Sequence, residues 1–273
     1  MSEIRSIVIT GNGTNCEREM AHANRLGGFD CADIVHISDM LSGDVRLDDY
    51  HMLNLAGGFL DGDDLGSAKA AANKYAWAKI ASTGEPFRQA ILRFIGQEKL
   101  ILGVCNGFQL LVKLGLLPAL EGRYFDQQVT LTHNESGRFE DRWVMLRINP
   151  YSPCVFTSGI KSLPLPVRHG EGKLIARDRE VRTQLFAKEL VAVQYARESD
   201  LEPTMDYPAN PNGSEEAIAG LCDETGRIFG LMPHPEAFNH RTNHPRWTRD
   251  DLPEEGLGVQ IFRNAAQYLR RKF

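Results

Sequence analysis

The sequence has few features of a secreted or membrane protein. None of its apolar runs approaches the roughly 18 residues of a membrane-spanning helix, and the opening residues, MSEIRSIVIT, lack the apolar core of a secretory signal. The cysteines are far apart and include no CxxC pair, which argues against a disulfide framework and against a zinc site built from cysteine pairs. These absences predict a cytoplasmic protein. The five cysteines are Cys16, Cys31, Cys105, Cys154 and Cys222.

An excess of positive charge is also missing. The 31 Lys and Arg residues and 36 Asp and Glu residues give a formal net charge of −5, so a general nucleic-acid surface or a surface for anionic membranes is not favoured. Hydrophobic residues make up 42% of the 273 residues, which is ordinary for a globular chain and sufficient for a large core. Because no repeat, low-complexity segment or linker divides the chain, we expect a single domain over residues 1–273.

The first half of the chain alternates short apolar runs with helical patterns. Strands are expected at residues 6–10, 31–37, 52–56 and 100–104, and helices at 17–26, 67–82 and 86–98. Such alternation is typical of a parallel sheet with helices on both faces. The second half is richer in strands, which are expected at 128–132, 142–149, 165–168, 191–196, 218–222 and 228–232, before a closing helix at 258–270. The predicted fold class is α/β, with a mostly parallel central sheet and extra β elements in the second half.

The stretch Gly103-Val104-Cys105-Asn106-Gly107 joins an expected strand to a helical pattern. A glycine two residues before and another two residues after the cysteine match a nucleophile elbow, with cysteine in place of serine. The turn is so tight that only small residues let the neighbouring elements approach each other. It also places Cys105 at a helix N-terminus, where the helix dipole favours a thiolate. The alternative interpretation is a buried structural cysteine.

Two glycine-rich turns follow earlier strands. Gly57-Gly58-Phe59 comes directly after the third strand and exposes backbone N–H groups, as an oxyanion site requires, although a simple tight turn is the alternative. The turn at residues 11–15, GNGTN, lacks the third glycine of the dinucleotide-binding fingerprint. Nucleotide binding at that first turn is therefore not favoured.

A cysteine nucleophile needs a base, and the base needs a group that orients it. His234 and Glu236 supply both, two residues apart at the end of the last expected strand, where a period of two points both side chains to the same side. Prolines on either side of His234 restrict its backbone. Cys105, His234 and Glu236 therefore form the hypothesis of a catalytic triad.

Other catalytic patterns fit less well. A zinc protease would carry HExxH, whereas residues 240–244 read HRTNH, so no metal ligands are predicted. A papain-like peptidase also spaces its cysteine and histidine widely, but its cysteine lies near the mature N-terminus in a different local sequence.

The motifs taken together resemble a known family. GVCNGFQ, PHPE and the order Cys, His, Glu are similar to the class I, triad-type glutamine amidotransferases, whose fold is flavodoxin-like. GNGTNCEREMAHA, NESGRFEDRW, HGEG and YPANPNGS extend the resemblance over residues 8–270, to the glutaminases of phosphoribosylformylglycinamidine synthases. One departure is Ala237, where that family usually carries arginine. A free-standing cysteine hydrolase or peptidase and a non-catalytic regulatory relative stay open as alternatives.

The resemblance implies roles for particular residues. Cys105 would attack the side-chain amide of glutamine, His234 would transfer protons, and Glu236 would orient His234. The backbone N–H groups of Gly58 and Asn106 would hold the oxyanion. The residues expected to contact glutamine by motif position are Gly57, Phe59, Gln109, Asn134 and Phe139.

The resemblance also implies a partner. The chain would need no cofactor of its own, whereas ATP and magnesium would belong to a synthetase subunit that receives the ammonia and uses it in purine synthesis. Whether a small third subunit is required stays open.

Overall fold

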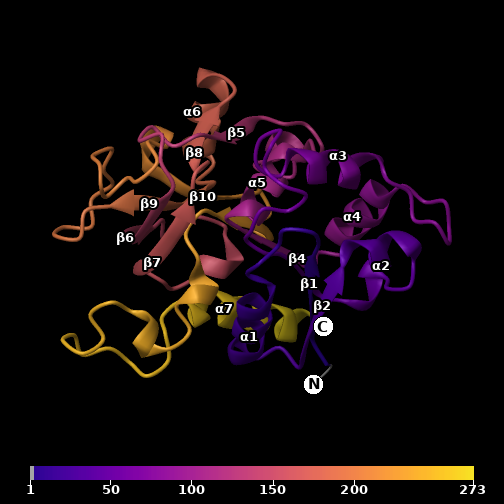
Figure 1. Cartoon of the computed structure of the whole chain (residues 1–273), viewed down its shortest axis with the longest axis horizontal. Helices are drawn as coiled ribbons and strands as arrows, with labels where there is room; N and C mark the ends of the chain where they lie inside the picture. Colours follow the sequence, from indigo (N-terminus) through magenta and orange to yellow (C-terminus); the bar gives the residue numbers. More distant parts are fainter. Residues whose placement is uncertain (1–2) are drawn as a thin grey trace.

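The computed structural model describes residues 3–273, and a central nine-stranded sheet organises them (Figure 1). The strands of this sheet are β1 (Arg5–Thr10), β2 (Cys31–His36), β3 (Met52–Leu55), β4 (Leu100–Val104), β6 (Glu140–Ile148), β7 (Ser162–His169), β9 (Val191–Ala196), β10 (Ile218–Cys222) and β11 (Ile228–Leu231). Their spatial order is β2-β1-β3-β4-β11-β10-β9-β6-β7. A small second sheet pairs β5 (Val129–Thr132) with β8 (Lys173–Ala176).

The sheet is mixed, and most of its strands run in one direction. Strands β2, β1, β3, β4 and β11 pair in parallel. Beyond β11 every pairing, through β10, β9, β6 and β7, is antiparallel. Within the described residues only β10 and β6 therefore oppose the other strands of the sheet. The prediction of a mostly parallel sheet with extra β elements in the second half is confirmed.

Helices cover both sides of the parallel half (Figure 1). Helices α1 (Glu17–Gly27) and α7 (Val259–Lys272) pack against each other on one side. On the other side lie α3 (Lys69–Trp77), α4 (Phe87–Gly96) and α5 (Asn106–Lys113), with α3 in contact with both of its neighbours. The remaining helices are α2 (Ile37–Ser42) and α6 (Arg179–Ala187).

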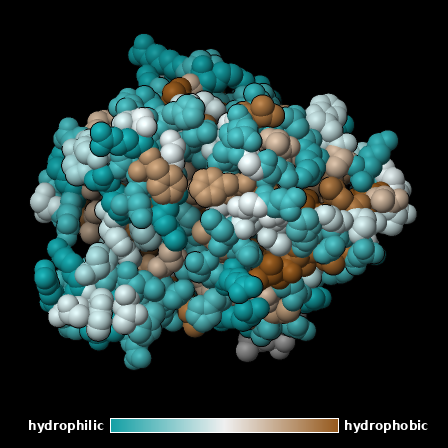
Figure 2. Space-filling model, viewed as in Figure 1, coloured by the Kyte–Doolittle hydropathy of each residue, from teal (hydrophilic) through white to brown (hydrophobic). Residues whose placement is uncertain are grey.

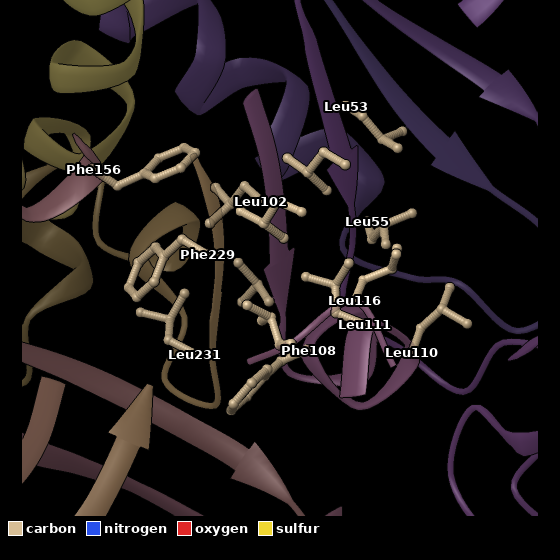
Figure 3. Close-up of a cluster of buried hydrophobic side chains, with 14 of the residues drawn as sticks. Leu53, Leu55, Leu102, Phe108, Leu110, Leu111, Leu116, Phe156, Phe229 and Leu231 are labelled. Atoms are coloured by element: carbon tan, nitrogen blue, oxygen red, sulfur yellow. The ribbon is translucent and has the colours of Figure 1, made fainter. Parts of the chain in front are cut away.

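The core is centred on β4 and the strands on either side of it. Every residue of β3, β4 and β11 is buried, as expected for central parallel strands covered on both faces. Figure 3 shows Leu102 of β4 between Leu53 and Phe229, with Phe108 of α5 approaching from the end of the strand. This packing fixes the position of the carboxyl end of β4, where Cys105 follows.

Several elements differ from the expectation. Strand β7 runs from Ser162, well before the expected start at residue 165, and it tolerates Pro164 and Pro166 because it lies at the edge of the sheet. Helix α3 ends at Trp77 because Ala78 is already extended (ψ 153°). Helix α2, strand β8 and helix α6 were not predicted. The signal for α6 was an N-cap, since the Asp178 carboxylate accepts a hydrogen bond of 2.8 Å from the Val181 N–H.

The surface is largely polar. Figure 2 shows one face on which hydrophilic residues predominate and apolar residues form only small separate patches. In the described part of the chain, no helix combines the length and the apolar character needed to cross a membrane.

Candidate active site

Cys105 lies between β4 and α5 in a backbone conformation that few non-glycine residues adopt (φ 52°, ψ −107°). The glycines on either side of it have the steric role that the sequence indicated. A Cβ at Gly103 would lie 2.6 Å from the carbonyl oxygen of Gly107, and a Cβ at Gly107 would clash with the carbonyl oxygen of Leu55. The strained turn therefore depends on glycine and presents the Cys105 thiol at the first turn of α5.

His234 and Glu236 lie at the same edge of the sheet as Cys105. They follow β11, which pairs in parallel with β4, so the carboxyl ends of the two strands are neighbours. The His234 N–H donates a 2.8 Å hydrogen bond to the carbonyl oxygen of Pro166 in β7, which fixes the backbone. The two side chains do not align through an extended period of two, because Glu236 lies in a short 3₁₀ turn, η5 (Pro235–Ala237), that folds it back onto the imidazole.

The buried His234 imidazole has a hydrogen-bond partner at Nδ1 and none at Nε2 among the described residues. His234 Nδ1 lies 2.6 Å from Glu236 Oε1, and both side chains are buried. No described residue hydrogen-bonds His234 Nε2. Burial opposes the charged imidazolium, but Glu236, Cys105 and Cys16 outweigh it and raise the pKa of His234 well above its ordinary value. The environment therefore favours an imidazolium that can accompany a thiolate.

Two backbone N–H groups lie near the nucleophile. A β-bridge joins Thr14 to Gly58. Its hydrogen bonds run from the Phe59 N–H to the Gly13 carbonyl oxygen and from the Asn15 N–H to the Gly57 carbonyl oxygen, so they do not use the Gly58 N–H. Asn106 is the first residue of α5, where an N–H group has no partner within the helix. Of these two residues, Gly58 lines the cavity beside Cys105 and Asn106 follows Cys105 directly in the chain.

A cavity of about 350 Å³ opens beside Cys105. Its lining residues are Gly58, Phe59, Asp63, Ser67, Cys105, Gln109, His133, Gly137, Arg138, Phe139, Arg168, His169, Gly170 and Glu171. Of the residues expected to contact glutamine, Phe59, Gln109 and Phe139 line this cavity. The Gln109 amide is held firmly, because it accepts a hydrogen bond from Asn106 Nδ2 (3.0 Å) and donates one to the Glu171 carbonyl oxygen (2.5 Å).

Two of the expected contacts lie outside the cavity lining. The side-chain amide of Asn134 is hydrogen-bonded within the protein. Its Nδ2 donates to the carbonyl oxygens of Arg138 (2.9 Å) and His169 (2.8 Å), and its Oδ1 accepts from the Gly172 N–H (2.9 Å). Gly57 provides space instead of contact, since a Cβ there would lie 2.8 Å from His234 Cε1. These two residues shape the site and do not face the cavity.

Sequence reasoning missed Arg168 and Cys16. Arg168 lines the cavity, and its Nε and Nη2 atoms are shielded from solvent without a hydrogen-bond partner among residues 3–273. Its carbonyl oxygen is 3.5 Å from Cys105 Sγ. Cys16 is buried beside His234, with its sulfur 3.2 Å from Asn15 Oδ1. Both residues lie in or next to motifs noted in the sequence, but nothing local indicated that their side chains reach the site.

His169 is a buried, uncharged residue of the cavity lining. Burial and the nearby positive charge of His234 lower the pKa of His169 to about 3. Its Nδ1 lies 3.2 Å from Asn134 Oδ1. A neutral imidazole held by the loop amide makes His169 a structural member of the HGEG segment.

Comparison with known proteins gives matches over the whole chain. A family model described as a CobB/CobQ-like glutamine amidotransferase domain matches residues 3–269. Phosphoribosylformylglycinamidine synthase subunit PurQ of Dehalococcoides mccartyi is 44% identical over 272 residues, which cover 99% of this chain and 100% of the relative. The protein of the same name from Methanococcus maripaludis is 38% identical, with 97% of each sequence covered.

Solved structures are also similar to this chain over nearly its whole length. A chain in the structure of PurLQS from Thermotoga maritima superimposes with a TM-score of 0.69 at 30% identity, covering 98% of this chain and 100% of that one. A glutamine amidotransferase from Thermotoga maritima superimposes with a TM-score of 0.53 over 98% of this chain and 99% of that one. At 16% identity this second similarity shows the fold alone.

Proposed function

Because the chain belongs to the family of CobB/CobQ-like glutamine amidotransferase domains, we propose that it is the glutaminase subunit of a phosphoribosylformylglycinamidine synthase. The observation that carries the proposal is the meeting of Cys105, His234 and Glu236 at one edge of the sheet, beside a cavity, in a chain that matches such subunits over its full length. The chain acts as one domain in the cytoplasm and hydrolyses glutamine to glutamate and ammonia.

The reaction proceeds through a thioester. The Cys105 thiolate attacks the side-chain amide carbon of glutamine, and the oxyanion that forms accepts hydrogen bonds from the N–H groups of Gly58 and Asn106. His234 gives its proton to the amide nitrogen, so the C–N bond breaks and ammonia leaves. His234 then takes a proton from water as the water attacks the thioester carbon, and the C–S bond breaks to release glutamate and restore the Cys105 thiolate beside the His234 imidazolium.

Glu236 acts on the histidine and not on the substrate. Its carboxylate holds Nδ1 at 2.6 Å, which aims Nε2 away from the 3₁₀ turn and stabilises the imidazolium. The burial of both side chains keeps water from competing for this hydrogen bond.

Arg168 is proposed to bind the α-carboxylate of glutamine. Arg168 belongs to the cavity lining, and two nitrogens of its guanidinium have no hydrogen-bond partner among the described residues. Such a group suits a planar anion, which can accept two parallel hydrogen bonds. Because that carboxylate does not change during acylation, its contact should contribute about equally to substrate and transition-state binding.

Arg168→Gln is expected to raise the KM for glutamine by about 10- to 100-fold with a smaller effect on kcat, as befits the loss of hydrogen bonds between charged groups. Steady-state kinetics of the assembled enzyme measures this. Arg142→Gln is the matched control, since Arg142 pairs with Glu140 and lies outside the cavity lining. A fall in kcat at unchanged KM would contradict the assignment.

The partner is a synthetase subunit that holds ATP and magnesium, with a small third subunit in the assembly. The support is the similarity to subunits of this name and to a chain of PurLQS. The site itself is consistent with activation by a partner, because Phe59 and Phe139 at the cavity are 46% and 54% exposed. Docking of the synthetase would order such polar and aromatic loop segments around bound glutamine.

Ammonia release tests the function directly. The isolated chain is expected to hydrolyse glutamine weakly, and the addition of the synthetase with its nucleotide and substrate should increase the rate by ~10²-fold, equivalent to ~2.7 kcal/mol. Release by a complex that carries Cys105→Ala serves as the background. Full activity of the isolated chain that the partner leaves unchanged would favour the alternative of a free-standing cysteine hydrolase.

A further inference from the structure

Asn134 uses all of its hydrogen-bonding atoms within the protein, so none is left for a substrate. Its six contacts go to the carbonyl oxygens of Arg138, His169 and Gly170, to the N–H groups of Gly137 and Gly172, and to His169 Nδ1. The backbone of Asn134 makes the contacts with Gly170 (2.9 Å) and Gly137 (3.0 Å). The side-chain amide makes the other four at 2.8–3.2 Å, which is its full capacity of two donors and two acceptor positions.

These contacts join two separate stretches of the wall of the cavity beside Cys105. Residues 137–139 lie in the loop between β5 and β6, whereas residues 168–171 lie at the end of β7 and just beyond it. Together the two stretches supply seven of the fourteen residues that line the cavity. Because both stretches bond to one residue that is only 3% exposed, half of the wall is held as a single unit.

The amide of Asn134 also fixes the position of the proton on His169. Its Nδ2 faces two carbonyl oxygens and its Oδ1 faces the Gly172 N–H, so the amide can have only this orientation. Because Oδ1 carries no hydrogen, the neutral His169 ring must donate from Nδ1 across 3.2 Å and keep Nε2 unprotonated. Both the backbone carbonyl and the ring of His169 are therefore held by one side chain.

Asn134 begins to bond to the chain where the strand pairing ends. The register between β6 and β7 ends with the pair of Glu140 and His169. Beyond that pair, the Gly170 carbonyl oxygen and the Gly172 N–H bond to Asn134 instead of to a neighbouring strand. Asn134 therefore supplies to the turn over residues 169–172 the kind of hydrogen bonds that the sheet supplies up to His169.

The same turn is connected to the nucleophile elbow through Gln109. The Glu171 carbonyl oxygen accepts the 2.5 Å hydrogen bond from Gln109 Nε2, and Gln109 Oε1 accepts a 3.0 Å hydrogen bond from Asn106 Nδ2. Asn106 follows Cys105 directly. A displacement of the turn would therefore displace the Gln109 amide, which lines the cavity.

We propose that Asn134 is a positioning residue that sets the affinity of the site for glutamine by holding residues 137–139 and 169–172 together as one wall. The inference rests on the proposed function and gives Asn134 no contact with the substrate. A wall that is already ordered binds glutamine at a lower entropic cost. Because the wall contacts the substrate and the transition state alike, its loss should appear in KM more than in kcat.

Two substitutions in the assembled enzyme test this role by steady-state kinetics. Asn134→Ala should raise the KM for glutamine by about 10-fold or more, since several buried hydrogen bonds are lost, and change kcat by less than ~3-fold. Asn134→Asp has nearly the same shape, but an oxygen replaces Nδ2 and faces two carbonyl oxygens, so it should raise KM to a similar extent. Asn73→Ala is the matched control, because Asn73 is exposed and bonds only within α3.

Two kinetic results would overturn the proposal. An unchanged KM in Asn134→Asp would show that only the shape of the residue matters. A fall in kcat at unchanged KM would place Asn134 in the chemical step. If the unmodified complex released no ammonia from glutamine, that result would instead refute the proposed function.

Hydrogen exchange of the isolated full-length chain tests the positioning role without any activity assay. The amides of residues 170–172 should exchange faster in both Asn134 variants, because the hydrogen bonds that hold this turn are lost. The amides of β4 should keep their protection, since they lie in the centre of the sheet. Unchanged exchange at residues 170–172, or an equal loss of protection in β4, would overturn the proposal.

Discussion

Cys105→Ala is expected to abolish glutamine-dependent amidine synthesis by the assembled enzyme, with a loss on the order of 10⁴-fold or more, the scale on which catalytic nucleophiles act. No other described side chain can replace it, because only the turn between β4 and α5 presents a thiol to the cavity. Synthesis supplied with ammonium salt should continue, since ammonia enters the reaction after the step that Cys105 performs. The two rates are measured on the same preparation.

The ratio of the two rates distinguishes chemistry from damage to the fold. Cys31→Ala is the matched control and should leave both rates near those of the unmodified enzyme, because Cys31 lies on β2 and outside the cavity. A loss of both rates in Cys105→Ala, with the complex still intact by gel filtration, would show that this cysteine is not confined to glutamine hydrolysis.

The triad could be predicted from the sequence because its signals are local. Gly103 and Gly107 are required by backbone contacts within one turn, so the elbow is visible in a few consecutive residues. The proximity of His234 follows from a simple rule, since β4 and β11 are parallel neighbours and their carboxyl ends share an edge. The predicted backbone conformation of residues 234–236 was wrong, because a 3₁₀ turn and not an extended strand brings Glu236 to the imidazole.

The remainder of the site depends on contacts between distant segments. Arg168 reaches the cavity from β7, at the far end of the sheet order, and Cys16 reaches His234 from the turn after β1. No periodicity or spacing encodes such contacts. The same limit explains Asn134, whose motif position suggested a substrate contact, although its amide in fact ties together two loops. Residue type indicates that a polar side chain will form hydrogen bonds, but only the packed structure shows with which partner.

His234→Ala is expected to block formation of the glutamyl thioester, with acylation slowed by roughly 10⁴-fold or more, because His234 is the group proposed to protonate the amide nitrogen that leaves as ammonia. Single-turnover mixing with glutamine, followed by mass analysis of the acylated chain, measures this step. His22→Ala, on the exposed face of α1, is the control. Acylation at the normal rate in His234→Ala would remove His234 from its role.

Glu236→Gln should be about 10²-fold milder than His234→Ala, because Glu236 orients the imidazole and transfers no proton. It should also move the pH profile in a defined direction. Glu236 helps to raise the pKa of His234, so the imidazolium persists to high pH in the unmodified enzyme and is lost as the pH rises through that pKa. Without the carboxylate the pKa falls, and the alkaline limb of kcat/KM should shift to lower pH. An unshifted limb, together with a normal acylation rate, would show that the 2.6 Å hydrogen bond between His234 and Glu236 has no catalytic role.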